Sequence, residues 1–382
     1  MKNAEELMRS FLSGKKNNLS LRRLISSEGL VDFCSNDYLG LANSKELFHR
    51  TSEILEQFKE PLNGSTGSRL LTGNNKHFIQ LENKIAAFHH AEAALIFNSG
   101  FDANFGLISS IAGKSDSIIY DELSHASIRD GIRLSTAKPY KFKHNDLSDL
   151  EHKLKISNGI VYVIVESLYS MDGDKADLKE INKLCQKYSA NLIIDEAHAG
   201  GIYGENGNGL ACANEISHSV FARIITFGKA FGTHGAAVIG SKVLKEFLVN
   251  VSRPLMYSTA LPPHSIAAIS AAYDLQSTLD GERKKLFDNI KYFKNQISKL
   301  DLKGFLTSNT AIQSIIVPGN AEVKKLAEVF QNKGYDIRPI LSPTVKSGTE
   351  RLRVCIHSFN HQSDIRELGT ILKQTTHESI PI

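Results

Sequence analysis

The chain has 382 residues, of which 41% are hydrophobic and 23% are charged. This length fits two or three domains, and this composition excludes a mainly disordered chain, a coiled coil and a collagen. Lys and Arg number 45 against 41 Asp and Glu, a net charge of +4. So small an excess over this length favours neither nucleic acid nor an anionic membrane as a partner.

Cysteine usage and hydropathy indicate the compartment. The four cysteines are scattered and form no CxxC pair, so we expect no zinc or other metal site and a reducing environment. Residues Met1 to Asn18 are polar and contain no apolar signal-peptide core. The strongest apolar run, Ile160 to Val165, is far shorter than the ~18 residues that a membrane-spanning helix needs. We therefore expect a cytoplasmic protein that does not enter a membrane.

In chain order, residues 1–45 form an N-terminal segment with one short helix, Ala4 to Leu12. Residues 46–262 then alternate helical stretches with short apolar strands, the pattern of a large α/β domain with a mainly parallel, seven-stranded sheet. The predicted strands are Ala94–Asn98, Ser117–Asp121, Pro139–Phe142, Ile160–Glu166, Asn191–Asp195, Arg223–Phe227 and Ala236–Gly240.

The pattern changes after Pro262 and Pro263. A long helical region, Ser265 to Leu300, precedes predicted strands at Ile312–Val317 and Arg351–Ile356. Residues 263–382 therefore read as a smaller C-terminal α+β domain. In open α/β sheets, ligands bind outside the carboxyl ends of the strands, so the residues there are the candidates for function.

The first candidate follows the strand Ala94–Asn98. Ser99, Gly100 and Phe101 open a helical stretch, where free backbone N–H groups and a glycine suit a phosphate. An ordinary strand-to-helix turn would have the same sequence.

Acidic residues and histidines follow two further strands. Asp195 ends a buried strand and implies a cationic partner, such as a protonated ring nitrogen; His198 follows three residues later. His125, after the strand ending at Asp121, could stack on a flat cofactor ring. The alternatives are a loop cap with a surface histidine for the first pair, and a helix N-cap at Ser124 with an incidental histidine for the second.

Two basic residues complete the set. Lys229 lies between two predicted strands with glycines on both sides, where a lysine can act as a Schiff-base nucleophile. Arg353 and Arg351 share one face of a strand, and a guanidinium is the usual clamp for a carboxylate. Taken singly, a surface lysine and a basic strand edge explain them equally well. Taken with the residues above, they indicate a pyridoxal-phosphate enzyme.

The chain resembles the α-oxoamine synthases, a family of fold-type I pyridoxal-phosphate transferases that join an amino acid to an acyl thioester with loss of CO2. The match is collinear from about Leu21 to Phe359. The blocks that carry it are Ser35–Leu41 (SNDYLGL), Gly64–Gly73 (GSTGSRLLTG), Asn98–Phe101, Asp121–Ser127 (DELSHAS), Ser170–Asp174 (SMDGD), Asp195–His198 (DEAH), Thr226–Ala237 and Tyr257–Pro263 (YSTALPP).

The resemblance implies a role for each matching residue. Lys229 would bond pyridoxal 5'-phosphate, Asp195 would pair with its ring nitrogen, His125 would stack on the ring and His198 would contact the ring oxygen. The other cofactor-binding residues would be Gly100, Phe101, Ser170 and Thr226, with Thr259 reaching the phosphate of the second chain in a homodimer that shares its active sites. The substrate side would hold Arg22, Asn36, Thr344 and Arg353.

Within the family, GSTGSRLLTG and YSTALPP are most similar to the members that condense L-alanine with a pimeloyl thioester, on CoA or acyl carrier protein, in biotin synthesis. Three alternatives stay open: a family member that uses glycine or serine, an aminotransferase of the same fold, and a cofactor-free scaffold. Near the site the chain departs from the usual family pattern at His234, at Ala199–Gly201 and in the short stretch after Arg22.

Overall fold

The computed structural model describes residues 3–59, 63–300 and 304–378, which divide into two compact units. The larger unit comprises Asn36–Ser170 and Lys175–Arg283, and the smaller unit comprises Met1–Ser35, Met171–Asp174 and Lys284–Ile382. The predicted division into residues 1–45, 46–262 and 263–382 stays a prediction. No helix in the described ranges has the length and apolarity to cross a membrane.

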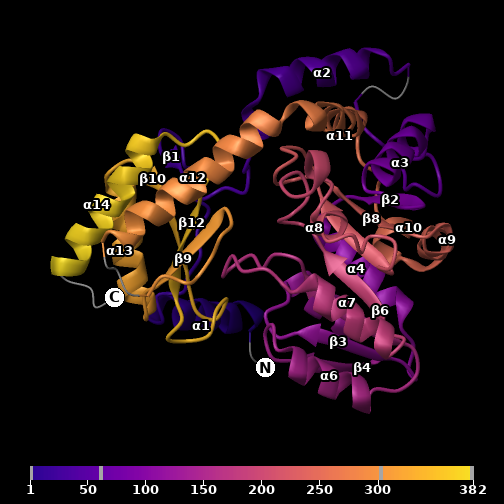
Figure 1. Cartoon of the computed structure of the whole chain (residues 1–382), viewed down its shortest axis with the longest axis horizontal. Helices are drawn as coiled ribbons and strands as arrows, with labels where there is room; N and C mark the ends of the chain where they lie inside the picture. Colours follow the sequence, from indigo (N-terminus) through magenta and orange to yellow (C-terminus); the bar gives the residue numbers. More distant parts are fainter. Residues whose placement is uncertain (1–2, 60–62, 301–303, 379–382) are drawn as a thin grey trace. The chain divides into compact units, whose positions relative to one another are not determined.

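A seven-stranded sheet organises the larger unit, with the strand order β2-β8-β7-β6-β5-β3-β4 (Figure 1). Its strands are β2 (Ala93–Phe97), β3 (Ser117–Asp121), β4 (Lys138–Phe142), β5 (Val161–Glu166), β6 (Asn191–Asp195), β7 (Ala222–Thr226) and β8 (Ala236–Gly240). Only β8 pairs antiparallel with its neighbours β2 and β7; the other pairings are parallel. The predicted fold class and mainly parallel sheet are therefore confirmed.

Helices in this unit connect and cover the strands. They are α2 (Lys45–Glu56), α3 (Lys76–Phe88), α4 (Gly100–Ile111), α5 (Ala126–Leu134), α6 (Leu147–Ile156), α7 (Leu178–Lys187), α8 (Leu210–Ala213), α9 (Lys242–Val251), α10 (Arg253–Met256) and α11 (Pro263–Leu275). Three short 3₁₀ turns, at Leu41–Asn43, Glu205–Gly207 and Gln276–Thr278, complete the regular structure.

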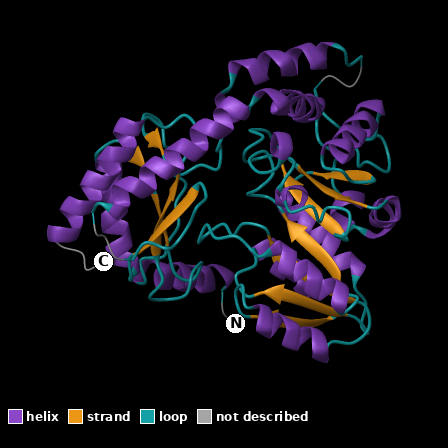
Figure 2. Ribbon diagram, viewed as in Figure 1, coloured by secondary structure: helices purple, strands orange, loops and turns teal. Residues whose placement is uncertain are grey.

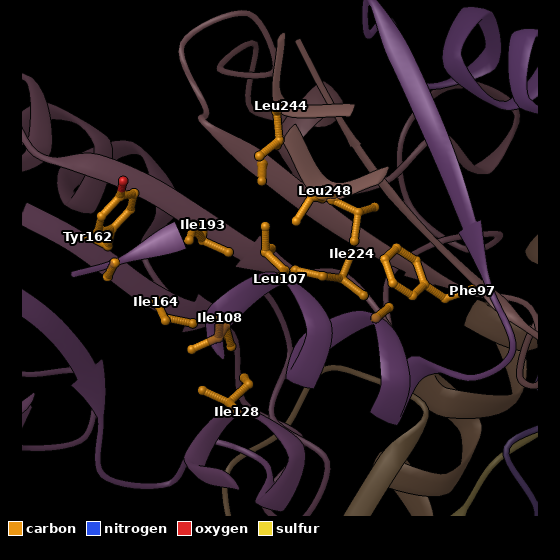
Figure 3. Packing of buried hydrophobic residues seen from close by; sticks show 14 of the residues in the cluster. Phe97, Leu107, Ile108, Ile128, Tyr162, Ile164, Ile193, Ile224, Leu244 and Leu248 are labelled. Atoms are coloured by element: carbon orange, nitrogen blue, oxygen red, sulfur yellow. The ribbon is translucent and has the colours of Figure 1, made fainter. Parts of the chain in front are cut away.

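Except for the edge strand β4, the strands are buried on both faces because alternate residues enter two different cores. Ile164 of β5 and Ile193 of β6 pack with Leu107 and Ile108 of α4, together with residues of α5, α9 and α10 (Figure 3). Val163 and Val165 of β5 instead join the core formed with α6, α7 and α8. This two-sided burial is the reason why the strands appear in the sequence as apolar runs without polar alternation.

The smaller unit contains two small sheets (Figure 2). β9 (Ile312–Ile316) and β11 (Arg338–Ile340) both pair antiparallel with β12 (Arg351–Cys355), and β1 (Val31–Asp32) pairs parallel with β10 (Tyr335–Asp336). Its helices are α1 (Ala4–Asn17), α13 (Asn320–Asn332) and α14 (Gln362–Glu378).

The predicted helical region Ser265–Leu300 is helical over nearly its whole length and is divided into two helices by a short 3₁₀ turn. α11 ends at Leu275, and α12 runs from Asp280 to Ser298. The buried Arg283 side chain donates to the Gln276 carbonyl at 2.9 Å and to the Gln276 side chain at 2.8 Å. Arg283 therefore satisfies this carbonyl and stabilises the turn between the two helices.

Candidate functional site

Polar side chains gather at the carboxyl edge of the large sheet. Glu166 ends β5 and Asp195 ends β6, and the register of the two parallel strands places them side by side. Asp121 and Thr226 end β3 and β7 at the same edge. This is the edge at which open α/β sheets bind their ligands.

A cavity of about 290 Å³ lies at this edge, wholly within the larger unit. It is lined by seven of the predicted site residues: Gly100, Phe101, His125, Asp195, His198, Thr226 and Lys229. These residues come from segments spread over about 130 positions of the sequence, and the strand ends bring them to one place. His234, one of the departures from the usual family pattern, also lines the cavity.

The Asp195 carboxylate is buried, with 5% of the residue exposed. One oxygen accepts from the Asn104 side chain at 2.7 Å, and the other accepts from the Ala197 N–H at 2.9 Å. Within the described ranges, no Lys, Arg or His side chain forms an ion pair with Asp195. A buried carboxylate supported only by neutral donors is suited to a cationic atom of a ligand.

A hydrogen-bonded chain connects Asp195 with His125. Asn104 also donates to the Ser127 hydroxyl at 3.1 Å, and this hydroxyl is 2.8 Å from Nδ1 of His125. His125 itself, not Ser124, is the N-cap of α5, since its ring accepts from the Ser127 N–H. Burial lowers the pKa of His125, against the opposing effect of Asp195, so the ring is favoured as a neutral group over the cavity.

Lys229 lies in the tight connection between β7 and β8. This turn is held by backbone bonds from Phe227 to Gly235, from Thr233 to Phe227 and from Gly232 to Lys229. The Lys229 Nζ atom is 2.9 Å from Nε2 of His198. The lysine amine therefore faces the cavity from a fixed main chain.

The N-terminus of α4 forms one wall of the cavity. Ser99 caps the helix by accepting from the Asp102 N–H at 3.0 Å. A Cβ atom on Gly100 would lie 2.6 Å from Cγ2 of Thr226, so only glycine allows this approach to β7. The first N–H groups of the helix, beside the Thr226 hydroxyl, provide donors for an anionic group.

Comparison with known proteins identifies the family. The family model for aminotransferase class I and II matches residues 28–368. The chain is 38% identical to the 8-amino-7-oxononanoate synthase of Emericella nidulans over 94% of this chain and 92% of that protein. The chain belongs to the aminotransferase class I and II family. This confirms the relationship that the sequence blocks indicated.

Two solved structures resemble this aminotransferase-family chain. The 8-amino-7-oxononanoate synthase of Francisella tularensis is 29% identical, with a TM-score of 0.78, over 92% of this chain and 98% of that one. The Sphingomonas wittichii serine palmitoyltransferase is 25% identical, with a TM-score of 0.91, over 98% of each chain. The fold is thus shared by synthases that differ in their named products.

Several expected site residues of this aminotransferase-family protein do not line the cavity. Ser170 and Asn36 both belong to the larger unit, and Asn36 accepts from the Tyr38 hydroxyl at 3.1 Å. Thr259 forms a bridge with Ser68, and its carbonyl accepts from the Asn98 side chain at 2.8 Å. Their predicted roles stay predictions.

The remaining three expected residues belong to the smaller unit. Arg22 donates to the Thr344 hydroxyl at 2.8 Å. Arg353 lies on β12 and donates to Sγ of Cys355 at 3.0 Å. Arg351 on the same strand forms an ion pair with Asp172.

Three residues at the site were not predicted from the sequence: Asn104, Glu166 and Tyr38. Glu166 could have been predicted, because it ends a predicted strand at the same edge of the sheet as Asp195. Asn104 and Tyr38 gave no such signal, since one lies inside a helix and the other in a loop.

Glu166 is a buried carboxyl group, and its Oε1 accepts from the His125 N–H at 2.6 Å. Burial, with a further contribution from Asp195, raises the pKa of Glu166 to about 8. Near neutral pH this side chain is therefore mainly protonated in the folded protein, while an unfolded chain would ionise it at about pH 4.3.

A pH dependence of stability follows. Between about pH 4.5 and the folded pKa of about 8, the folded state binds more protons at Glu166 than the unfolded state. The free energy of unfolding is then expected to fall as pH rises through this window, by a few kcal/mol. Glu166→Gln stays neutral and can still accept from His125, so denaturant unfolding should show its stability rising relative to the parent from pH 5 to pH 9.

Glu122→Gln is the matched control, because the Glu122 side chain is 39% exposed. It should keep the parent's pH dependence. The free energy of unfolding of Glu166→Gln could instead differ from that of the parent by the same amount at pH 5 and at pH 9. That result would show that Glu166 ionises normally.

Proposed function

We propose that the protein is an 8-amino-7-oxononanoate synthase. It condenses L-alanine with a pimeloyl thioester, on CoA or acyl carrier protein, releasing CO2 and the free thiol. The observation that carries this proposal is the 38% identity to a synthase of that name over 94% of the chain. The shared fold with a second synthase of that name, at 29% identity, supports it.

The cavity fits pyridoxal 5'-phosphate. The Asp195 carboxylate is buried and, among the residues that the structure describes, has no cationic side chain in an ion pair with it, so it suits the protonated ring nitrogen. The N-terminus of α4, the glycine at position 100 and the Thr226 hydroxyl suit the phosphate. Lys229 supplies the amine that bonds the cofactor, and His198 and the neutral His125 supply imidazoles at the same cavity.

When bound, pyridoxal phosphate supplies the electron sink that lets a bond to the amino acid Cα break. The amine of Lys229 takes the Cα proton and later returns a proton to the product. Asp195 keeps a positive charge stable at the cofactor's ring nitrogen through its fixed negative charge. His125, neutral and held by Ser127, assists at the acyl oxygen.

The substrate residues are proposed from the family resemblance. Arg353 would clamp the amino-acid carboxylate, and fixing that group selects which Cα bond is aligned to break. Arg22, Asn36 and Thr344 would bind the remaining parts of the substrates, and Ser170 would contact the cofactor.

A homodimer with shared sites is part of the proposal. Phe101 lines the cavity yet is 45% exposed, and Tyr257, two residues before Thr259, is 70% exposed. A second chain over these rings would bury apolar surface and bring its Thr259 to the phosphate. Light scattering that gave the mass of one chain would contradict this. The four free thiols support a cytoplasmic location.

Turnover with defined substrates tests the function. Alanine, glycine and serine would each be supplied with pimeloyl, acetyl and palmitoyl thioesters, and thiol release and CO2 would be measured together. We expect turnover with alanine and a pimeloyl thioester. Turnover confined to glycine with acetyl-CoA, or to serine with palmitoyl-CoA, would assign the chain to another synthase. Amino transfer to a 2-oxoacid without thiol release would indicate an aminotransferase.

A further inference from the structure

Behind Lys229 lies a hydrogen-bonded chain that the proposed mechanism does not use. Its central member is Tyr38, a tyrosine with only 1% of its surface exposed. The Tyr38 hydroxyl is 2.7 Å from Nδ1 of His198, and Nε2 of the same ring is 2.9 Å from Nζ of Lys229. His198 therefore connects a buried hydroxyl with the reactive amine.

The direction of these bonds follows from the far end of the chain. The Tyr38 hydroxyl donates to Oδ1 of Asn36 at 3.1 Å, and a carbonyl oxygen can only accept. A phenol has one proton, so the Tyr38 oxygen is an acceptor toward His198. The imidazole then carries its proton on Nδ1 and donates it to Tyr38.

This tautomer decides what His198 offers to the lysine. With the proton on Nδ1, Nε2 has a free lone pair and accepts from the Lys229 amine. With the opposite tautomer, Nε2 would donate, and the lysine would receive a proton donor where it needs an acceptor. One tautomer therefore gives the Lys229 amine a hydrogen-bond acceptor, and the other gives it a hydrogen-bond donor.

Other charged groups surround the lysine and affect its protonation. Asp195 and Glu166, at the ends of β6 and β5, and His125, at the start of α5, all interact electrostatically with Lys229 or with one another. The Tyr38 hydroxyl is bonded to Asn36 and to His198, at 3.1 Å and 2.7 Å. A change confined to this hydroxyl therefore isolates the contribution of the His198 tautomer.

We propose that Tyr38 and Asn36 are positioning residues that fix the tautomer of His198 and make its Nε2 the acceptor for a proton of Lys229. In the transfer, an Nζ–H bond breaks and an Nε2–H bond forms. The neutral amine keeps the electron pair, and the resulting imidazolium donates from Nδ1 to Tyr38. No other reactant is needed. The inference rests on the proposed function only in naming Lys229 as the cofactor lysine.

The test measures the reactivity of Lys229 directly. Full-length protein freed of cofactor would be labelled with a trace of acetic anhydride across a pH series, and acetylation of Lys229 would be quantified by mass spectrometry. In Tyr38→Phe, the imidazolium loses its acceptor, so we expect labelling about tenfold slower near neutral pH. The deficit should close at strongly alkaline pH, where hydroxide deprotonates the lysine.

Two further variants make the result specific. Tyr162→Phe removes a buried hydroxyl whose bond is to the Ile111 carbonyl, away from the cavity, and should label Lys229 as the parent does. Asn36→Ala frees the proton of Tyr38 to turn toward Nδ1, which favours the opposite tautomer, so it should also slow labelling. Because Asn36 is only partly buried, this variant tests the proposal even if Tyr38→Phe fails to fold.

Parent-like labelling in folded Tyr38→Phe or Asn36→Ala over the whole pH range would overturn the proposal. Equal slowing in Tyr162→Phe would also overturn it, because the cause would then be general. Loading the parent with pyridoxal phosphate should protect Lys229 from acetylation. Missing protection would instead count against the proposed function, so the two failures can be distinguished.

Discussion

Replacing Lys229 with alanine is expected to reduce turnover by about four orders of magnitude or more. In the proposed function, this side chain supplies both the amine that bonds the cofactor and the proton acceptor at the substrate Cα. Its loss should also remove the visible absorbance of covalently held cofactor, since Lys229 is the lysine that lines the cavity. Steady-state assays and absorbance spectra of the purified variant measure the two effects.

Lys175→Ala is the matched control. Lys175 is an exposed residue of the same unit that lies over the Tyr203 ring, 4.0 Å from its centroid, and it does not line the cavity. This variant should keep its colour and its turnover. A Lys229→Ala protein that still held covalently bound cofactor would show that another residue is the cofactor lysine.

Asp195→Asn should have the second-largest effect, with a loss of about 10²- to 10⁴-fold in kcat/KM. The substitution keeps the shape of the side chain and removes the negative charge that we propose holds the ring nitrogen protonated. Affinity for the cofactor should fall as well, because a buried cation on the ligand would lose its partner. Equilibrium dialysis against pyridoxal phosphate measures the affinity separately from turnover.

The neighbouring strand supplies a control for the loss of a buried carboxylate. Asp121 ends β3, forms an ion pair with His144 at 2.9 Å and does not line the cavity. Asp121→Asn should lower the melting temperature and leave cofactor affinity unchanged. If both variants bound the cofactor as tightly as the parent, Asp195 would have no ionic role at the ring nitrogen.

Much of the large sheet was predictable because its strands other than the edge strand β4 are short, apolar and covered on both faces. Ser117–Asp121, Asn191–Asp195 and Ala236–Gly240 were predicted with the observed bounds. β1 and β10 were not predicted, because a two-residue strand carries no periodic signal. The short break before α12 was not resolved within the predicted helical region, because a side-chain bond from Arg283 to the Gln276 carbonyl stabilises it.

The site was predictable where a reactive residue follows a strand directly, as Asp195 does. The residues that support Asp195 and His125 could not be predicted in this way. Asn104 lies inside α4, and only the packing of that helix on the sheet places its amide 2.7 Å from the Asp195 carboxylate. The pairing of Glu166 with Asp195 depends on the register of β5 against β6, which the sequence of either strand alone does not determine.

The turn that carries Lys229 also bears on the order of events during folding. β7 and β8 form an antiparallel hairpin of adjacent segments, so the turn closes with a small loss of chain entropy. Its acceptor chain needs Tyr38 and His198, which are separated by 160 residues, and so depends on a slow, long-range contact. We therefore expect the turn to form before this contact, and the proposed acceptor for the Lys229 amine to be in place only once Tyr38 has packed against His198. A nascent chain that has not completed this packing should therefore capture aldehydes poorly, which protects the lysine from adventitious modification before the protein is finished.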